Sequence, residues 1–294
     1  MHEIRRLPLL LALMAAVAAS AFAQDGAPFQ PPDESSLPDD EFGRLVRTGK
    51  DLFVNTDRLR GTYVGNGLKC VNCHLDAGRL ADSAPLWAAY GVYPAYRRKT
   101  GRVDSFDNRL QGCFMYSMNG KAPPAGSPEL DALKTYAFWL ATKAPVGVSL
   151  PGRGYPEPDP PAQAPSIERG AKVYAQNCAI CHGDDARGTK VGDDYVFPPL
   201  AGDDSYNWGA GMHRINTAAA FIKANMPLGK PNSLSDQEAW DVAMFVNSRE
   251  RPQDPRFEGD LAATRKTHHD ENCLYGDEVD GHVLGSVEPA GIAQ

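Results

Sequence analysis

The chain lacks three features. Beyond its N-terminus it has no long apolar run, it has no excess of basic residues, and it has few stretches in which apolar and polar residues alternate. After the first twenty or so residues there is no run of about 18 apolar residues, so the mature chain is not expected to span a membrane. Acidic residues outnumber basic ones, 37 to 30, which argues against a nucleic-acid partner. Alternating apolar positions are too few to predict a sheet. The 42% hydrophobic content is sufficient for a core and excludes wholesale disorder.

The N-terminus is the exception to the shortage of apolar runs. Arg5 and Arg6 precede an apolar stretch over residues 7–19, and the small-residue triplet 21–23 follows. This order is typical of a secretory signal peptide, here residues 1–23. We expect export to the periplasm by the general route. Twin-arginine export is the alternative, but the rest of that signal is absent.

A proline-rich segment divides the remaining chain. Seven prolines and three glycines fall between Lys143 and Pro165, which predicts an extended linker. The chain length also agrees with two domains. We expect an all-α protein with two tandem domains. Its parts are an N-terminal extension (24–40), a first domain (41–146), a linker (147–164), a second domain (165–252) and a C-terminal tail (253–294).

The same order of features appears on both sides of the linker, which indicates two copies of one helical unit. Each copy opens with a helical pattern that carries a glycine and, four residues later, an aromatic side chain. A Cys-x-x-Cys-His motif follows, and a late apolar-faced helix closes each copy. The paired features are Gly49 and Phe53 with a late helix at about 130–140, and Gly170 and Tyr174 with a late helix at about 236–247.

The two Cys-x-x-Cys-His motifs are the strongest chemical signal. Two cysteines at this spacing can form thioethers with one haem, and the next residue, His, can ligate its iron. A thioredoxin-like pair needs no His, and a zinc site would need further ligands at suitable spacing. We therefore predict two covalently attached haem c groups and two cytochrome c domains. The haem-binding residues are Cys70, Cys73 and His74 in the first domain, and Cys178, Cys181 and His182 in the second.

Met226 is the predicted second ligand of the second iron. It follows a helical stretch, 218–225, in a loop position where small cytochromes present a thioether to iron. Met212, His213 and Met244 compete, although Met244 is better explained as a core residue of the last helix. A thioether ligand raises the reduction potential, which suits a haem from which electrons leave.

The second ligand of the first iron is less clear from the residues. Cys113, Met115 and Met118 are the candidates. Four of the six cysteines belong to the haem motifs, so Cys113 and Cys273 remain, and in an oxidising compartment they could form a disulfide. Against this, Cys273 lies in a polar tail with no sign of a packed element. Composition alone leaves both alternatives open.

The stretch that begins at Arg109 reads Arg-x-x-x-Cys-x-x-x-Ser-Met-Asn-Gly and lies between the two haem motifs. This pattern resembles the dihaem thiosulfate dehydrogenases, also called tetrathionate synthases, and the resemblance covers roughly residues 41–252. It implies a periplasmic enzyme that oxidises two thiosulfates to tetrathionate, or reduces tetrathionate, at a His/Cys-ligated first haem. It also implies that Cys113 is the distal ligand and a catalytic residue, that Arg109 and Ser117 line the substrate pocket, and that Met226 ligates the second iron.

One position departs from the family pattern. Some relatives carry a Lys immediately before the methionine ligand and exchange the two, whereas this chain has Asn225 there. Lys223 is three residues from Met226. The departure favours permanent His/Met ligation of the second haem.

Thiosulfate is a dianion and the chain is acidic, so a local cationic pocket is required. The segment 97–109 is rich in cations, and we expect Arg109 to bind the sulfonate because it precedes Cys113 by four residues. For the other cations a solvated surface loop is the better interpretation. These are Arg97, Arg98, Lys99 and Arg102. Lys121 is a further candidate for the substrate pocket, after Arg109 and Ser117.

Cys113 has a second role in this hypothesis, because a thiolate is a good sulfur nucleophile that can carry a thiosulfate-derived group. Electrons would then pass to the second haem and on to a small acceptor such as another cytochrome c. The tail is expected to be flexible or to contact a partner. His268 and His269 could bind a metal there, although solvated residues are the favoured interpretation.

Three other functions fit parts of the pattern. A c4-like electron carrier would use Met115 or Met118 in place of Cys113. A dihaem peroxidase would need a spare imidazole, for which His213 and the tail histidines are available. A sulfur-carrier cytochrome would act on the thiol of another protein.

Overall fold

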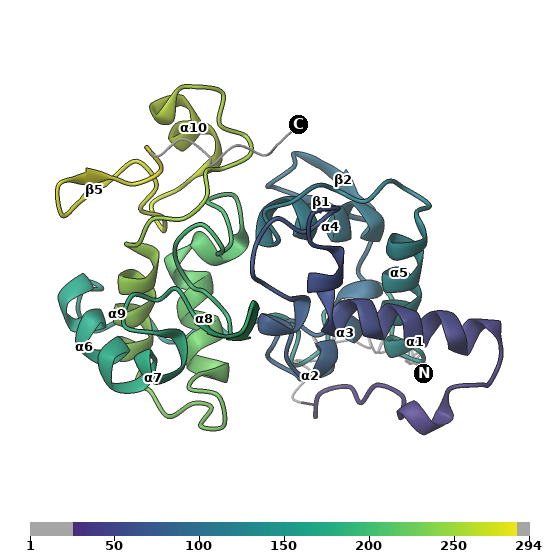
Figure 1. Ribbon diagram of the computed structural model, residues 1–294. Helices are drawn as coiled ribbons and strands as arrows, with labels where there is room; N and C mark the ends of the chain where they lie inside the picture. The colour runs from purple at the N-terminus through teal and green to yellow at the C-terminus, as the bar shows by residue number, and fades with distance from the viewer. Residues whose placement is uncertain (1–25, 287–294) are drawn as a thin grey trace, which may run out of the picture.

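The computed structural model describes residues 26–286, which form ten α-helices and three short hairpins (Figure 1). Each strand in this range pairs with a single antiparallel neighbour, so the helical fold class predicted from the sequence is confirmed. No helix among these residues is long and apolar enough to cross a membrane. The predicted signal peptide, residues 1–23, lies outside the described residues.

The elements before the proline-rich segment lie together on one side of the molecule (Figure 1). The helical turns and helices are η1 (Glu34–Ser36), α1 (Glu41–Val54), η2 (Thr56–Leu59), η3 (Cys70–Asn72), α2 (Leu75–Gly78), α3 (Leu86–Tyr90), α4 (Phe106–Gly112), η4 (Cys113–Ser117) and α5 (Pro128–Leu140), and the strands are β1 (Ala95–Arg97) and β2 (Arg102–Asp104).

The elements after that segment lie on the other side, with α10 and β5 at their outer end (Figure 1). The helical elements are α6 (Ile167–Asn177), α7 (Ala179–His182), η5 (Gly211–His213), α8 (Ile215–Asn225), α9 (Asp236–Asn247) and α10 (Leu261–His268), and the strands are β3 (Thr189–Val191), β4 (Asp194–Phe197), β5 (Glu278–Val279) and β6 (His282–Val283).

Two helix pairs, α1 with α5 and α6 with α9, cross in the same way. A Cβ atom on Gly49 would lie 2.0 Å from the carbonyl oxygen of Ala132 in α5. A Cβ atom on Gly170 would likewise lie 2.0 Å from the carbonyl oxygen of Asp241 in α9. Each glycine therefore allows its helix to approach the late helix closely, which explains why the sequence repeats it.

The late helices occupy the predicted positions. The helix α9 has the predicted bounds, and α5 begins two residues before the predicted start, after Ser127, whose side chain accepts a hydrogen bond from the backbone N–H of Leu130. Ser235 and Glu238 form a reciprocal capping box at the start of α9. These caps satisfy backbone donors that a helix leaves free at its N-terminus.

The proline-rich segment contains no helix or strand between α5 and α6 in the described chain, but it contacts the first half. Gly152 O accepts a hydrogen bond from the backbone of Asp82 at 2.8 Å. The Tyr155 hydroxyl donates to Cys73 O at 3.0 Å. The segment therefore runs along the first Cys-x-x-Cys-His motif.

The sequence analysis allowed a tail that is flexible or contacts a partner, and the flexible alternative is wrong for residues 253–286. Cys273, Tyr275 and Leu284 form a buried cluster with Trp208, and each is 2% exposed or less. The Tyr275 hydroxyl also donates to Gln253 Oε1 at 2.8 Å. A few large side chains at irregular spacing hold this segment in place, and irregular spacing produces no periodic signal in the sequence.

Two asparagines join the halves of the molecule. Asn66 Nδ2 donates to Ser117 O at 2.8 Å and to Ser205 O at 3.0 Å. Asn207 Nδ2 donates back to Met115 O at 2.9 Å. Both asparagines are nearly fully buried, so these bonds are protected from competition by water.

Candidate functional site

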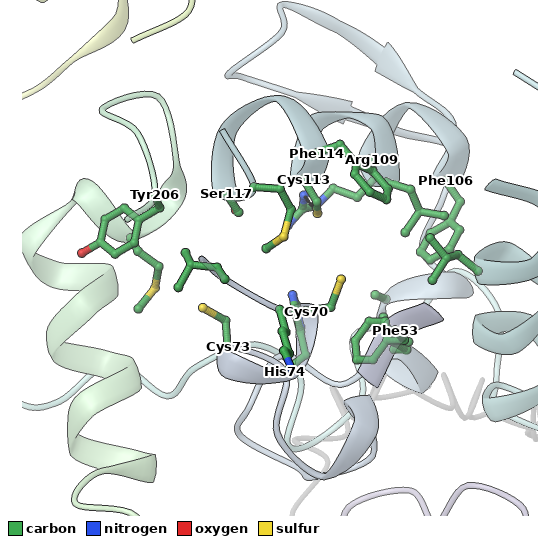
Figure 2. A pocket seen from close by; sticks show the side chains of 18 residues that line it. Phe53, Cys70, Cys73, His74, Phe106, Arg109, Cys113, Phe114, Ser117 and Tyr206 are labelled. Atoms are coloured by element: carbon green, nitrogen blue, oxygen red, sulfur yellow. Dashed lines mark hydrogen bonds between the residues drawn. The ribbon is translucent and has the colours of Figure 1, made fainter. Parts of the chain in front are cut away.

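The first Cys-x-x-Cys-His motif forms one wall of a cavity (Figure 2). Cys70 begins the turn η3, and the left-handed turn α2 begins directly after His74. His74 Nδ1 lies 2.7 Å from Ala84 O, and because a carbonyl only accepts, Nδ1 must carry the proton. Burial lowers the pKa of His74 to about 4, so the ring is neutral and Nε2 is free to act as a ligand.

The opposite wall of the cavity carries the residues singled out by the family resemblance. Arg109, Cys113 and Ser117 follow each other at intervals of four along α4 and η4, and all three line the cavity. Figure 2 shows them facing Cys70, Cys73 and His74 across the open space. The turn η4 is π-helical, a form that occurs frequently at functional sites.

The cavity fits a haem group. Its lining is mostly apolar with a few polar side chains, as is typical of cofactor and ligand sites. Burial raises the pKa of the Cys70 and Cys73 thiols to about 12, which keeps them uncharged until they react. The His74 imidazole and the Cys113 thiol lie on opposite walls, so both could hold the iron of a haem bound between them. The apolar side chains lining the cavity include Phe53, Leu68, Leu86, Phe106, Leu110 and Leu133.

Arg109 contacts the proposed iron ligand directly. Its Nη1 donates to Cys113 Sγ at 2.8 Å. The charge of Cys113 raises the pKa of Arg109, so this guanidinium remains a cation in an otherwise largely apolar cavity. A buried cation attracts anions more strongly than an exposed one because little water screens it.

The alternatives left open by the sequence are partly resolved. All six cysteines lie within the described residues and all are free, so Cys113 and Cys273 do not form a disulfide. Met118 lines the same cavity as Cys113, whereas Met115 is not among the lining residues. His213 does not line it either, which leaves the peroxidase hypothesis without an imidazole from that residue.

Two arginines of the basic segment are neutralised away from the cavity. Asp104, which is 1% exposed, pairs with Arg102 at 3.0 Å and with Arg97 at 3.7 Å. Arg98 and Lys121 are exposed. The surface-loop interpretation of Arg97, Arg98 and Arg102 therefore agrees with their positions, and Lys121 does not line the cavity.

Lys99 is neither a solvated residue of a surface loop nor one of the residues that line the cavity. Its Nζ lies 3.4 Å from the centre of the Tyr116 ring and donates to Gly209 O. Burial, followed by the charges of Arg256 and Arg109, lowers the pKa of Lys99 to about 7. The lysine thus links the basic segment to the second half of the molecule.

Tyr206 and Met212 also line the first cavity, although both come from the second half of the chain. Figure 2 shows Tyr206 beside a helix of that half. From the sequence, Met212 is a competing candidate ligand for the second iron, and Tyr206 carries no functional signal. No local pattern marks these residues, because only the packing of the two halves brings them to the cavity.

The second Cys-x-x-Cys-His motif has the same local geometry as the first. His182 Nδ1 lies 2.8 Å from Pro198 O, which again places the proton on Nδ1, and burial lowers the pKa of His182. Thr189 in β3 donates to Cys181 O at 2.6 Å. Burial raises the pKa of the Cys178 thiol to about 11. These residues also fit a covalently attached haem.

Met226 follows the last residue of α8 and is half-buried. Lys223 Nζ donates to Leu234 O at 2.6 Å, so that lysine is already engaged. Asn225 donates to Asp82 O at 2.9 Å. Met244 packs in the apolar core between α8 and α9, as predicted. Ligation by Met226 remains a prediction.

A helical fold around a Cys-x-x-Cys-His motif, with an imidazole whose Nδ1 carries the proton on the wall of a largely apolar cavity, defines a c-type cytochrome. The family described as cytochrome c oxidase, cbb3-type, subunit III, matches residues 165–246. A thiosulfate dehydrogenase of Stutzerimonas stutzeri is 56% identical and covers 87% of this chain and 85% of its own length. One of Thiomonas intermedia is 52% identical over 94% of both chains. The chain belongs to the thiosulfate dehydrogenase family.

A solved structure supports the same assignment. The thiosulfate dehydrogenase TsdBA of Marichromatium purpuratum superposes with a TM-score of 0.86 at 50% identity. The match covers 89% of this chain and 58% of that chain, so the present chain spans little more than half the length of this solved relative.

Proposed function

We propose that the chain joins two thiosulfates into tetrathionate, and can run the reaction in reverse, in the cavity between His74 and Cys113. The observation that carries this proposal is the half-buried Arg109–Cys113 pair, which faces a histidine whose Nε2 is free to bind iron. Membership of the thiosulfate dehydrogenase family supports the substrate. The sequence signal in residues 1–23 supports a periplasmic location.

The proposed enzyme has two tandem cytochrome c domains, 41–146 and 165–252, and two haem c groups. When bound, the haems supply two one-electron acceptors for the electron pair that the reaction releases. Cysteine thioethers would attach both groups. The first would be held by Cys70, Cys73, His74 and Cys113, and the second by Cys178, Cys181, His182 and Met226.

Arg109 binds the substrate in this proposal. One of its five N–H groups is used by Cys113 Sγ, so others are available to a sulfonate group. Ser117, one helical turn beyond Cys113, offers a hydroxyl to the same anion. A charged donor and a neutral donor would thus orient thiosulfate with its outer sulfur toward Cys113.

Cys113 provides the reacting sulfur. Its thiolate and the outer sulfur of one thiosulfate form a disulfide bond, and this step releases two electrons and no proton. The outer sulfur of a second thiosulfate then attacks the sulfonate-bearing sulfur. The central bond of tetrathionate forms, the bond to Cys113 breaks, and the thiolate is regenerated. Arg109 stabilises that thiolate as it leaves.

The electrons leave through an external acceptor, which we propose is a small cytochrome c. The chain carries a net charge of −7, so a partner with a basic docking face would be attracted to it. This attraction should weaken as the ionic strength rises.

The direct test is to mix the oxidised protein with thiosulfate in the absence of oxygen. We expect partial reduction of the haem spectrum together with formation of tetrathionate in the same sample. If thiosulfate does not reduce the protein, and tetrathionate does not oxidise the reduced form, the electron-carrier function replaces the proposed one. Met118 would then be the natural iron ligand, since it lines the same cavity.

The role of Cys113 is tested by Cys113→Ala. We expect turnover to be lost while haem remains attached, because Cys70 and Cys73 are unchanged. Met115→Leu is the matched control, since Met115 lies on the same turn but is not a cavity residue. Full turnover by Cys113→Ala would contradict the covalent scheme.

A further inference from the structure

Three buried side chains with metal-binding atoms meet outside the haem cavity. They are His213 at the end of η5, His269 just after α10, and Cys273 in the loop before β5. Cys273 Sγ lies 3.0 Å from His213 Nδ1 and 3.3 Å from His269 Nδ1. His213 is 5% exposed, Cys273 is 1% exposed, and the side chain of His269 is fully buried. The prediction that the tail histidines are exposed to solvent is therefore wrong for His269.

The spacing of these atoms suits one transition-metal ion. In a tetrahedral zinc site, bond lengths of about 2.0–2.1 Å to nitrogen and about 2.3 Å to sulfur place neighbouring sulfur and nitrogen ligands about 3.6 Å apart. The two observed sulfur–nitrogen distances are slightly shorter than this. A movement of the side chains by a few tenths of an ångström would lengthen the observed sulfur–nitrogen distances to those expected around the ion.

The surroundings hold the three residues in place as a second layer around a metal would. Asp254 Oδ2 lies 3.1 Å from His269 Nε2, on the ring nitrogen that does not face Cys273. Such carboxylate–histidine contacts fix the orientation of metal-binding imidazoles. Arg256 holds the same carboxylate through two hydrogen bonds, of 2.9 and 2.6 Å.

Tyr275 supports the cluster from the other side. Its backbone N–H points at Cys273 Sγ from 3.3 Å, and its ring stacks on His269 with centres 4.2 Å apart. The thiolate of Cys273 would offset one of the two charges of a divalent ion, while the charge of the Asp254 carboxylate is shared with Arg256. A buried ion needs such charged ligands because removing a charge from water is costly.

We propose that His213, His269 and Cys273 form a metal site for a single zinc or copper ion, separate from both haem motifs. A thiolate with two imidazoles is a ligand set that both ions accept. Zinc would complete its tetrahedron with a water molecule, and copper can accept the three ligands in a trigonal arrangement. The site ties the C-terminal segment, 253–286, to η5.

The position of η5 gives the site a structural consequence. Met212, the neighbour of His213, lines the first haem cavity. An ion bound here would therefore fix the part of the second half that closes the proposed active site. In Figure 1, α10 and β5 lie above α8 and α9, and β5 points away from the first half.

The test uses the complete haem-loaded protein. The wild type is incubated under reducing conditions with zinc or copper, passed through a desalting column and analysed for metal by mass spectrometry. We expect one equivalent of ion per chain. Cys273→Ser and His213→Gln should lose it, whereas His268→Ala, which changes a neighbouring histidine outside the cluster, should retain it.

X-ray absorption at the metal edge provides a second measurement that needs no variant. It should show one sulfur and two imidazole ligands in the wild type, and the edge energy identifies zinc or copper. Loss of the ion on desalting, equal retention by Cys273→Ser, or a spectrum without sulfur would each overturn the proposal. An unchanged circular dichroism spectrum and an unchanged visible haem spectrum in the variants show that they have folded.

Discussion

At the scale of single residues, the contact between Arg109 and Cys113 is the central feature of the site. The two residues are four apart on a helical segment, so their side chains emerge on the same face. The pair is part of a largely apolar cavity, where a charge-assisted hydrogen bond is stronger than in water. A substitution of Arg109 that keeps the positive charge but changes the geometry of the donor groups should therefore alter substrate binding.

We predict that Arg109→Lys lowers kcat/KM for thiosulfate by roughly 10- to 100-fold. Lysine keeps the positive charge but loses the planar fork that can contact sulfur and sulfonate together. A hydrogen bond to a charged group contributes about 1.5–3 kcal/mol, which corresponds to this range. Steady-state kinetics with an artificial electron acceptor measure the effect. An unchanged kcat/KM would remove Arg109 from the substrate site.

Lys99 predicts a pH dependence of stability. Its pKa is about 7 in the folded protein, against about 10.4 for an unperturbed lysine. Between these values the unfolded chain binds more protons than the folded one, so the free energy of unfolding rises as the pH rises. Lys99→Met should flatten that rise.

Denaturant midpoints at about pH 7 and about pH 10 measure the effect of Lys99. Lys121→Met changes an exposed lysine and should keep the pH dependence of the wild type. If the Lys99 and Lys121 variants respond equally to pH, the buried lysine is not its source.

At the scale of elements, the helices were the most predictable part of the fold. The α9 bounds follow from the apolar face and the Ser235 cap, both of which are local in the sequence. The sequence shows that the glycines repeat, but it does not show why. The carbonyl group that each glycine approaches belongs to a helix more than 70 residues away. The proximity of Arg109 and Cys113 could also be predicted, because their four-residue spacing on a helix is a local property of the sequence.

We predict that Gly170→Ala destabilises the protein by about 1–3 kcal/mol or more. The new methyl group would lie 2.0 Å from Asp241 O and 2.8 Å from Phe245 Cβ, so α6 and α9 would have to separate. Gly211→Ala is the control, since a Cβ atom there meets nothing within 4 Å. Chemical unfolding followed by circular dichroism compares them, and equal midpoints would refute close packing at this crossing.

At the scale of the whole molecule, several important contacts join residues that are far apart in the sequence. Tyr206 and Met212 belong to the second half but line the first cavity, and Cys273 meets His213 across 60 residues of chain. The C-terminal segment packs through a few irregularly spaced large side chains rather than through a periodic face. Contacts of this kind depend on how the parts of the chain assemble, and a single sequence carries no local signal for them.

We predict that Met212→Ala lowers the reduction potential of the haem bound at the first motif. Removal of this side chain opens the cavity wall on the side of the second half and admits water, which favours the more highly charged oxidised iron. Redox titration followed by visible spectroscopy measures the shift, with Met115→Leu as a control. An equal or higher potential in Met212→Ala would show that this wall does not exclude water.

The reciprocal bonds of Asn66 and Asn207 have a consequence for electron flow. Each buried amide belongs to one half and holds the backbone of the other, and both contact the turn that carries Cys113. The two Cys-x-x-Cys-His motifs are therefore kept at a constant separation. Electron exchange between groups bound there is governed by distance and driving force, without a diffusive search of one half for the other.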